Sequence, residues 1–142
     1  MPREVPALAR ELGLEPHPEG GWYRETWRSP VAVTLPDGRV RATGTMIHFL
    51  LPAGERSAWH RVASDEMWIA QTGVVTLEMG GSADRPATAS AHLVGTDIAS
   101  GHASQVLVPA GVWQRTVPSA YDALVSCLVS PGFDFADFEL EV

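Results

Sequence analysis

The sequence has no lysine, one cysteine and no long hydrophobic run, and each shortage excludes a class of function. All ten basic residues are arginine, so the chain has neither a Schiff-base lysine nor the lysine of a phosphate-binding loop. Cys127 is alone, which excludes an internal disulfide and favours a small buried hydrophobe in a cytoplasmic protein. No run approaches the roughly 20 apolar residues of a membrane span, and we expect no signal peptide in residues 1–14.

Positive charge is scarce as well. Ten arginines stand against 17 acidic residues, which gives a formal net charge of −7. Phosphate binding needs a basic face, so we expect neither nucleic acid nor an anionic membrane as a partner. A length of 142 residues suits one domain, residues 1–142, with one core.

Short strands between Gly and Pro turns predict an all-β fold. A short N-terminal helix comes first, because apolar residues recur at helical spacing within residues 7–14 after Pro6. Residues 22–28 alternate as a strand, Pro36-Asp37-Gly38 is a hairpin turn, and residues 39–51 form one long strand that is apolar on both faces. This pattern is typical of an antiparallel sandwich or barrel, with further strands expected at residues 74–79, 92–94, 105–108, 113–117 and 123–129.

The strongest functional signal lies in residues 54–73, GERSAWHRVASDEMWIAQTG. Two alternating runs flank a short polar connection and predict two strands that face each other. Because side chains two apart on a strand share a face, His60 can meet Glu66 on the facing strand. An acid and a base that converge beside tryptophans suit proton-transfer chemistry, and a chemically silent buried pair is the alternative.

This stretch resembles the first sequence motif of the cupin superfamily. The motif has a second His where this chain has Val62, and the matching positions are Gly54, His60, Glu66 and Gly73. Residues 109–114, PAGVWQ, resemble the second motif, with Gln114 at the place of its metal-binding His and Ala103 at the place of an upstream Gly.

Longer segments resemble one cupin family, called DUF985 or Cupin_5. The matches are LGLEPHPEGGWYRETWRS at residues 12–29, TMIHFLLPAGERSAWHRVASDEMW at 45–68, VPAGVWQ at 108–114 and SPGFDFADFEL at 130–140. The resemblance implies a cupin-type antiparallel jelly roll with a short N-terminal helix. It does not imply an activity, because a fold does not determine function.

The resemblance also implies a central site at His60, Glu66 and Gln114. Iron oxygenases usually need two imidazoles and a carboxylate, and catalytic zinc commonly takes three good protein donors. One imidazole, one carboxylate and a neutral amide are a weak set. We therefore expect no cofactor, with a divalent Fe, Mn or Zn ion on these three residues, in an oxygenase or isomerase, as the alternative.

The favoured hypothesis is a metal-independent isomerase, epimerase or cyclase that acts on a small metabolite, as do the sugar-nucleotide epimerases that share the cupin fold. His60, near its ordinary pKa, would be the base, Glu66 would orient or protonate it, and Tyr23 or His48 would be the acid. A non-catalytic module that binds a metabolite is the alternative. The expected ligand-binding residues are Ser57, Trp59, Trp68, Trp113, Gln114 and Phe133, and Arg61 could assist in the binding module.

Two further segments bear on the site. Residues 15–21, EPHPEGG, form a loop whose His17 and Glu19 either reach the pocket mouth or form a solvated turn. The tail, residues 133–140, alternates Phe with Asp and is expected to cover the barrel. Because a long apolar strand needs protection and cupins commonly pair, we expect a homodimer.

Overall fold

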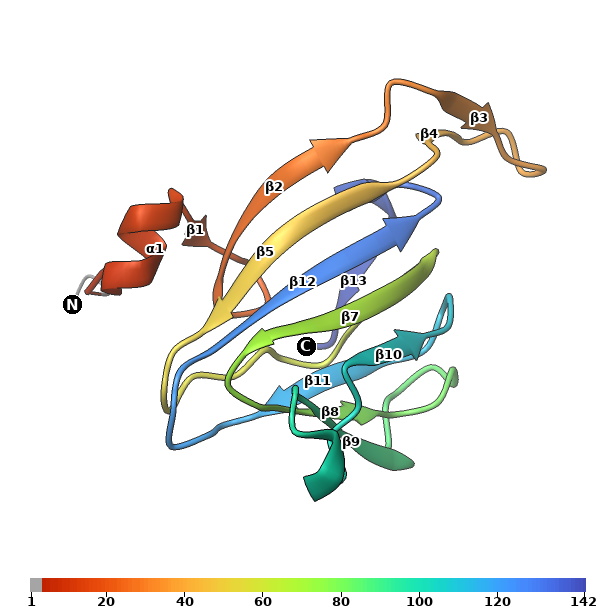
Figure 1. The fold of residues 1–142 in the computed structure, drawn as a ribbon. Coiled ribbons are helices and arrows are strands. Elements are labelled where there is room, and N and C mark those ends of the chain that lie inside the picture. Colours follow the sequence, from red (N-terminus) through yellow and green to blue (C-terminus); the bar gives the residue numbers. More distant parts are fainter. Residues whose placement is uncertain (1–3) are drawn as a thin grey trace.

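Two antiparallel sheets form the layers of a sandwich in the computed structural model, which describes residues 4–142 (Figure 1). The larger sheet contains, in spatial order, β1 (Glu15–Pro16), β2 (Trp22–Arg28), β5 (Thr45–Leu51), β12 (Ala123–Ser130), β7 (Asp65–Thr72) and β10 (Gln105–Val108). The smaller sheet contains β13 (Phe138–Leu140), β6 (His60–Val62), β11 (Gln114–Val117), β8 (Val75–Met79) and β9 (Ser90–Val94). The predicted antiparallel all-β architecture is confirmed.

The main core lies between the two sheets. Alternation along each strand sends one set of side chains inward, as period-two patterns require. Phe49 and Trp68 from the larger sheet meet Leu77 from the smaller one, and all three are almost fully buried. Cys127 is buried in the same cluster, as expected for a small hydrophobe.

The predicted N-terminal helix is α1 (Ala7–Leu12), and it ends at Gly13 in the left-handed conformation with φ of 68°. Ala9 and Leu14 pack against Trp22 and Leu50 in a second apolar cluster. The helix thus covers one end of the larger sheet. No helix among residues 4–142 has the length and apolar character needed to cross a membrane.

The prediction of one long strand at residues 39–51 is wrong in one respect, because the structure has two strands there. β4 (Val40–Ala42) pairs with β3 (Ala32–Thr34) around the predicted turn, and β5 begins at Thr45 in the larger sheet. The break falls at Gly44, where a Cβ would lie 3.1 Å from the Trp27 ring. A side chain at this position would press on the indole, which would have to move by a few tenths of an ångström.

Residues 54–73 do form two strands, but these strands do not pair with each other. β6 is limited to three residues and lies between β13 and β11 in the smaller sheet. β7 lies between β12 and β10 in the larger sheet. His60 and Glu66 therefore approach each other from opposite sheets, and not along a hairpin.

The predicted alternation of β2 is interrupted. The register between β2 and β5 shifts between Glu25 and Trp27, so that Trp27 pairs with Met46. A bulge of this kind sends the residue after it to the other face. Trp27 consequently leaves the inner face that Tyr23 occupies, and its side chain is half exposed.

The C-terminal tail covers one side of the interior, as expected. It contains a short 3-10 helix, η2 (Phe135–Asp137), followed by β13; a second one, η1 (Ile98–Ser100), lies between β9 and β10. The Asp137 carboxylate accepts hydrogen bonds from Arg41 at 2.8 and 2.9 Å, and the Phe133 amide donates to Thr45 Oγ1 at 2.9 Å. These contacts fix the tail against β4 and β5.

Candidate functional site

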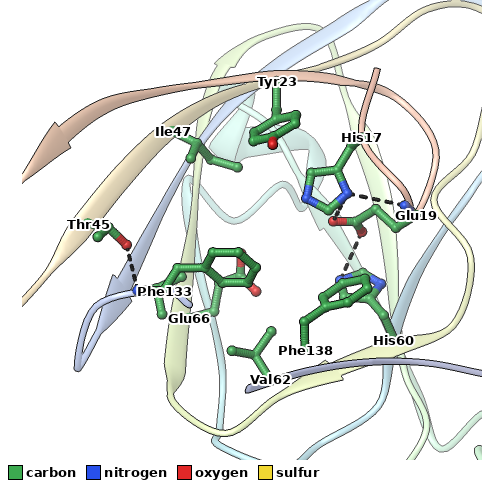
Figure 2. Close-up of a pocket in the computed structure, with 11 residues that line it drawn as sticks. His17, Glu19, Tyr23, Thr45, Ile47, His60, Val62, Glu66, Phe133 and Phe138 are labelled. Carbon is green, nitrogen blue, oxygen red and sulfur yellow. Dashed lines mark hydrogen bonds and ion pairs between the residues drawn. The ribbon is translucent and has the colours of Figure 1, made fainter. Parts of the chain in front are cut away.

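A pocket of about 390 Å³, measured out to its open mouth, lies between the two sheets (Figure 2). Most of its wall is apolar, and no arginine lines it. The lining residues are His17, Glu19, Tyr23, Thr45, Ile47, His60, Val62, Glu66, Val129, Phe133 and Phe138.

The loop between β1 and β2 enters the pocket, which corrects the interpretation of residues 15–21 as a solvated turn. The side chains of His17 and Glu19 are only 5% and 8% exposed. The loop closes through a hydrogen bond from the Gly20 amide to the His17 carbonyl at 3.0 Å. Gly21, with φ of 74°, lies where a Cβ would be 2.7 Å from the Phe49 ring, so glycine is required there.

His60 and Glu19 form a buried ion pair. The Nε2 atom of His60 lies 2.9 Å from Glu19 Oε2, and the two side chains are 2% and 8% exposed. The pair therefore lies almost entirely away from solvent. His60 Nδ1 lies 2.7 Å from the Ala58 carbonyl, which only accepts, so Nδ1 carries a proton.

This arrangement makes His60 a cation at neutral pH. Burial opposes the charge on the ring, but the nearby carboxylates of Glu19 and Glu66 outweigh it and raise the pKa of His60 to about 9. The expectation that His60 has an ordinary pKa and acts as the base is therefore wrong. His60 is a proton donor and a source of positive charge in this pocket.

Glu66 lies at the end of a hydrogen-bonded chain of three side chains. Trp68 Nε1 donates to Gln114 Oε1 at 2.8 Å, and Gln114 Nε2 donates to Glu66 Oε1 at 2.8 Å. Since the indole N–H can only donate, it determines which end of the amide faces which neighbour. Gln114 therefore presents its NH2 group to Glu66.

Burial, together with the nearby charge of Glu19, raises the pKa of Glu66 to about 7, although the charge of His60 and the Gln114 hydrogen bond act in the opposite direction. Burial also raises the pKa of the Cys127 thiol, and the charge of Glu66 adds to that effect. Glu66 is thus close to half ionised at neutral pH, which is the condition that suits a general base.

His17 is a neutral imidazole on the same wall as Glu19. The Glu19 amide donates to His17 Nδ1 at 3.2 Å, so Nδ1 is the accepting nitrogen and Nε2 carries the proton. Burial lowers the pKa of His17, which keeps the ring uncharged. In Figure 2 the other nitrogen is on the side of the ring away from Glu19, toward the middle of the pocket.

Tyr23 and Glu66 both line the pocket and come from different strands. Tyr23 comes from β2 near the top of Figure 2, and Glu66 comes from β7, lower in the view and behind Phe133. Burial raises the pKa of Tyr23, with the charges of Glu15 and Glu25 adding to the effect, so its hydroxyl stays protonated at neutral pH.

The donor set does not fit a metal ion. No three His, Cys, Asp or Glu side chains among residues 4–142 are placed to hold one together. Val62 offers no donor, and Gln114 turns an N–H and not its oxygen toward Glu66. The proton on Nδ1 and the ion pair at Nε2 occupy both nitrogens of His60. The residues of this pocket therefore do not supply the ligands that the metal hypothesis requires.

The structure brings four of the predicted site residues into the pocket: His60, Glu66, Tyr23 and Phe133. Gln114 lies behind Glu66 and orients it. His48 does not line the pocket, because it alternates with the inward-facing Ile47 and pairs with Ser126 on the outer face. Its predicted role as the acid has no support in this geometry.

The remaining predicted ligand-binding residues have structural contacts. Ser57 exchanges hydrogen bonds with Thr116, and Trp68 packs edge-to-face on Phe49 in the core. The rings of Trp59 and Trp113 stack under arginine side chains, those of Arg115 and Arg61 respectively. Arg61 is also paired with Glu139, so it does not face the pocket.

The sequence did not decide whether His17 and Glu19 reach the pocket or lie in solvent. Loop composition alone cannot separate a solvated turn from one that folds inward, because both are rich in Pro and Gly. The usable signal was the length of the family resemblance, since residues 12–29 match as one segment that includes both side chains.

Comparison with known proteins identifies the family of this chain and structures with a similar fold. A model of the family Cupin_5, described as Cupin superfamily (DUF985), matches residues 6–141. A hypothetical protein from Leishmania major is 35% identical with a TM-score of 0.85, over 94% of this chain and 85% of that one. A protein from Shewanella oneidensis is 37% identical with a TM-score of 0.81, over 98% and 85%.

An uncharacterized protein of Saccharomyces cerevisiae is 29% identical over 96% of this chain and 74% of its own length. More distant structures include enzymes, such as an oxalate decarboxylase of B. subtilis, 16% identical with a TM-score of 0.61 over 89% of this chain and 29% of that one. Likeness at that distance shows the shared cupin fold alone.

Proposed function

This chain belongs to Cupin_5, the DUF985 family of the cupin superfamily, and on that premise we propose that its pocket transfers protons at a carbon next to a carbonyl group. The reaction class is that of an isomerase, an epimerase or a cyclase, and it needs no metal ion. The substrate is a small metabolite whose carbonyl-bearing part fits within the pocket.

One observation carries the proposal: a carboxyl group with a pKa near 7 and an imidazolium with a pKa near 9 share one enclosed cavity. Perturbed groups of this kind gather at catalytic sites more than elsewhere. A pKa near the working pH gives a base that is both available and strong enough to accept a proton. The pair thus supplies base and acid without a cofactor.

Each group has a role in the proposed reaction. The Glu66 carboxylate takes the proton from the carbon, and the electron pair of that C–H bond moves onto the carbonyl oxygen as an enolate. The positive charge of His60 stabilises the enolate oxygen. For inversion, the Tyr23 hydroxyl returns a proton to the opposite face of the carbon. Glu66 then releases the proton it took to solvent, and solvent reprotonates Tyr23.

The charges of the pocket also restrict the substrate. The lining groups are one cation and two carboxyl groups, and no arginine adds positive charge. A diphosphate or a sugar nucleotide would place several negative charges beside Glu19 and Glu66. A neutral carbonyl compound suits this balance better, because it gains charge only when the enolate forms.

The test is exchange of substrate hydrogen with solvent. Small neutral α-hydroxy ketones are incubated in D2O with the wild-type protein, and the loss of the α-proton signal is followed by NMR. We expect exchange to slow by at least about 100-fold in Glu66→Gln, the usual size of one general base. Glu11→Gln, an exposed change on α1, is the matched control and keeps the wild-type rate.

Two results would contradict the proposal. Binding of a compound without any exchange would instead indicate a non-catalytic binding module. Exchange that continues unchanged in a folded Glu66→Gln variant would remove Glu66 from the mechanism.

A further inference from the structure

A second hollow, a groove of about 790 Å³ with an open side, lies directly outside the pocket. It shares Tyr23, Ile47 and Phe133 with the pocket, so the two spaces meet at these side chains. Its other wall residues are Glu25, Arg28, Asp134 and Phe135. A ligand that extended past these three side chains would enter the groove.

The surface of the groove is aromatic where it adjoins the pocket. Phe133 and Phe135 pack edge-to-face with their ring centres 4.9 Å apart, and Phe135 remains 47% exposed. Tyr23 contributes a third ring. A half-exposed phenylalanine that is held in place by a neighbouring ring offers a preformed flat surface, and flat rings stack on such surfaces.

The charged groups of the groove are already paired. Arg28 donates two hydrogen bonds to Glu25, at 2.7 and 3.2 Å, and a third to the Phe133 carbonyl at 3.1 Å. Asp134 accepts from the Ala136 amide at 2.8 Å. An added phosphate or carboxylate would meet an Arg28 whose charge Glu25 already offsets, while Glu25 and Asp134 would repel it.

We propose that the substrate has two uncharged parts, a carbonyl-bearing head that enters the pocket and a flat ring that stacks in the groove among Tyr23, Phe133 and Phe135. The role of the head rests on the function proposed above. The ring subsite goes beyond it, since it names the substrate class: neutral aromatic or similarly planar carbonyl compounds, and not sugars or phosphorylated metabolites.

Three probes that share the same hydroxyketone head separate the contribution of a ring to binding from that of a negative charge. 2-Hydroxyacetophenone carries a phenyl ring, hydroxyacetone carries no ring, and dihydroxyacetone phosphate carries a phosphate. Dissociation constants are measured by NMR titration of the whole protein. We expect the phenyl compound to bind about tenfold or more tightly than hydroxyacetone, and the phosphate to bind no better than hydroxyacetone.

Variants of Phe135 test whether the ring of the ligand stacks on this side chain. Phe135→Ala should reduce the affinity ratio of the phenyl compound to hydroxyacetone by about 3- to 10-fold, the size of one aromatic pair. Phe135→Trp keeps a flat surface and should retain most of the ratio. Tyr121→Ala, which removes an aromatic side chain that is 79% exposed and lines a different hollow, is the control and should leave the ratio unchanged.

The outcomes distinguish the two proposals. Tight binding of the phenyl compound without α-proton exchange would contradict the proposed function and leave the ring subsite standing. Three other results would overturn the ring subsite. One is α-proton exchange with equal affinity for hydroxyacetone and the phenyl compound. The others are an affinity ratio of these two compounds that does not change in a folded Phe135→Ala variant, and tighter binding of dihydroxyacetone phosphate. Failure of the phenyl compound to bind up to its solubility limit would overturn it too.

Discussion

The Glu19 carboxylate and the His60 imidazolium, 2.9 Å apart, join the loop between β1 and β2 to strand β6. Each lies in a place that is almost closed to solvent, so each charge depends on the other for its stability. His60 is the one histidine at a cupin motif position in this sequence. Because Glu19 stabilises its protonated form, His60 is a proton donor.

Glu19→Gln should lower the pKa of His60 from about 9 to below that of a free histidine, because burial of the ring then outweighs the remaining attraction from Glu66. The measurement is a pH titration of the His60 ring by NMR. Glu4→Gln, a change at an exposed position near the start of the sequence, is the control. A His60 pKa that stays near 9 in Glu19→Gln would show that another group holds its charge.

The Glu66 and His60 contributions to stability should fall as pH rises from about 4.5 to about 9, while His17, whose pKa is lowered by burial, acts in the opposite direction below about pH 6.5. The pKa of Glu66 is about 7 in the folded chain against 4.5 as its ordinary value, and that of His60 is about 9 against 6.5. Between each pair of values the folded chain binds more protons than the unfolded chain, so raising the pH favours unfolding. Urea unfolding at several pH values measures this, and a folded Glu66→Gln variant should lose the decline between pH 4.5 and 7.

Gln114→Ala should destabilise the fold by about 2 to 4 kcal/mol, because it leaves the Trp68 N–H and the Glu66 carboxyl group without their buried partner. Removal of the Gln114 hydrogen bond should also raise the pKa of Glu66. Chemical unfolding gives the first quantity and NMR titration the second. Gln105→Ala, at an exposed position of β10, should change neither.

Purified protein should contain no stoichiometric Fe, Mn or Zn, and a chelator should leave its melting temperature unchanged. The double variant Val62→His with Gln114→His should gain a site for Co²⁺ with visible absorption, because it restores imidazoles at both motif positions beside His60 and Glu66. Elemental analysis of both proteins is the measurement. A full equivalent of metal in the wild type would contradict this prediction.

The homodimer expected from sequence stays a prediction, and the outer face of the larger sheet is the surface we propose for it. The pairing of strands aligns an apolar row across five of them: Trp27, Met46, Leu128, Met67 and Leu107. Trp27 and Leu107 are nearly half exposed. Light scattering should give twice the chain mass, and Trp27→Asp with Leu107→Asp should give the monomer; a monomeric wild type would refute the proposal.

The places of most strands along the chain, and the identity of the two central groups, could be predicted from the sequence and its family resemblance. Period-two alternation, hairpin turns and motif spacing are local properties, so they predicted β2, β8, β10, β12 and the pocket positions of His60 and Glu66. The departures at Val62 and Gln114 likewise indicated a poor metal site before any geometry was known.

Only the tertiary structure decided what those groups do. The roles depend on which side chains meet, and the partner of His60 proved to be Glu19, 41 positions earlier in a loop without periodicity. The bulge in β2, the outward direction of His48 and the inward fold of residues 15–21 arise from packing between segments far apart in the chain. A pKa is likewise set by burial and by neighbouring charge, and both come into being only when the two sheets close around the pocket.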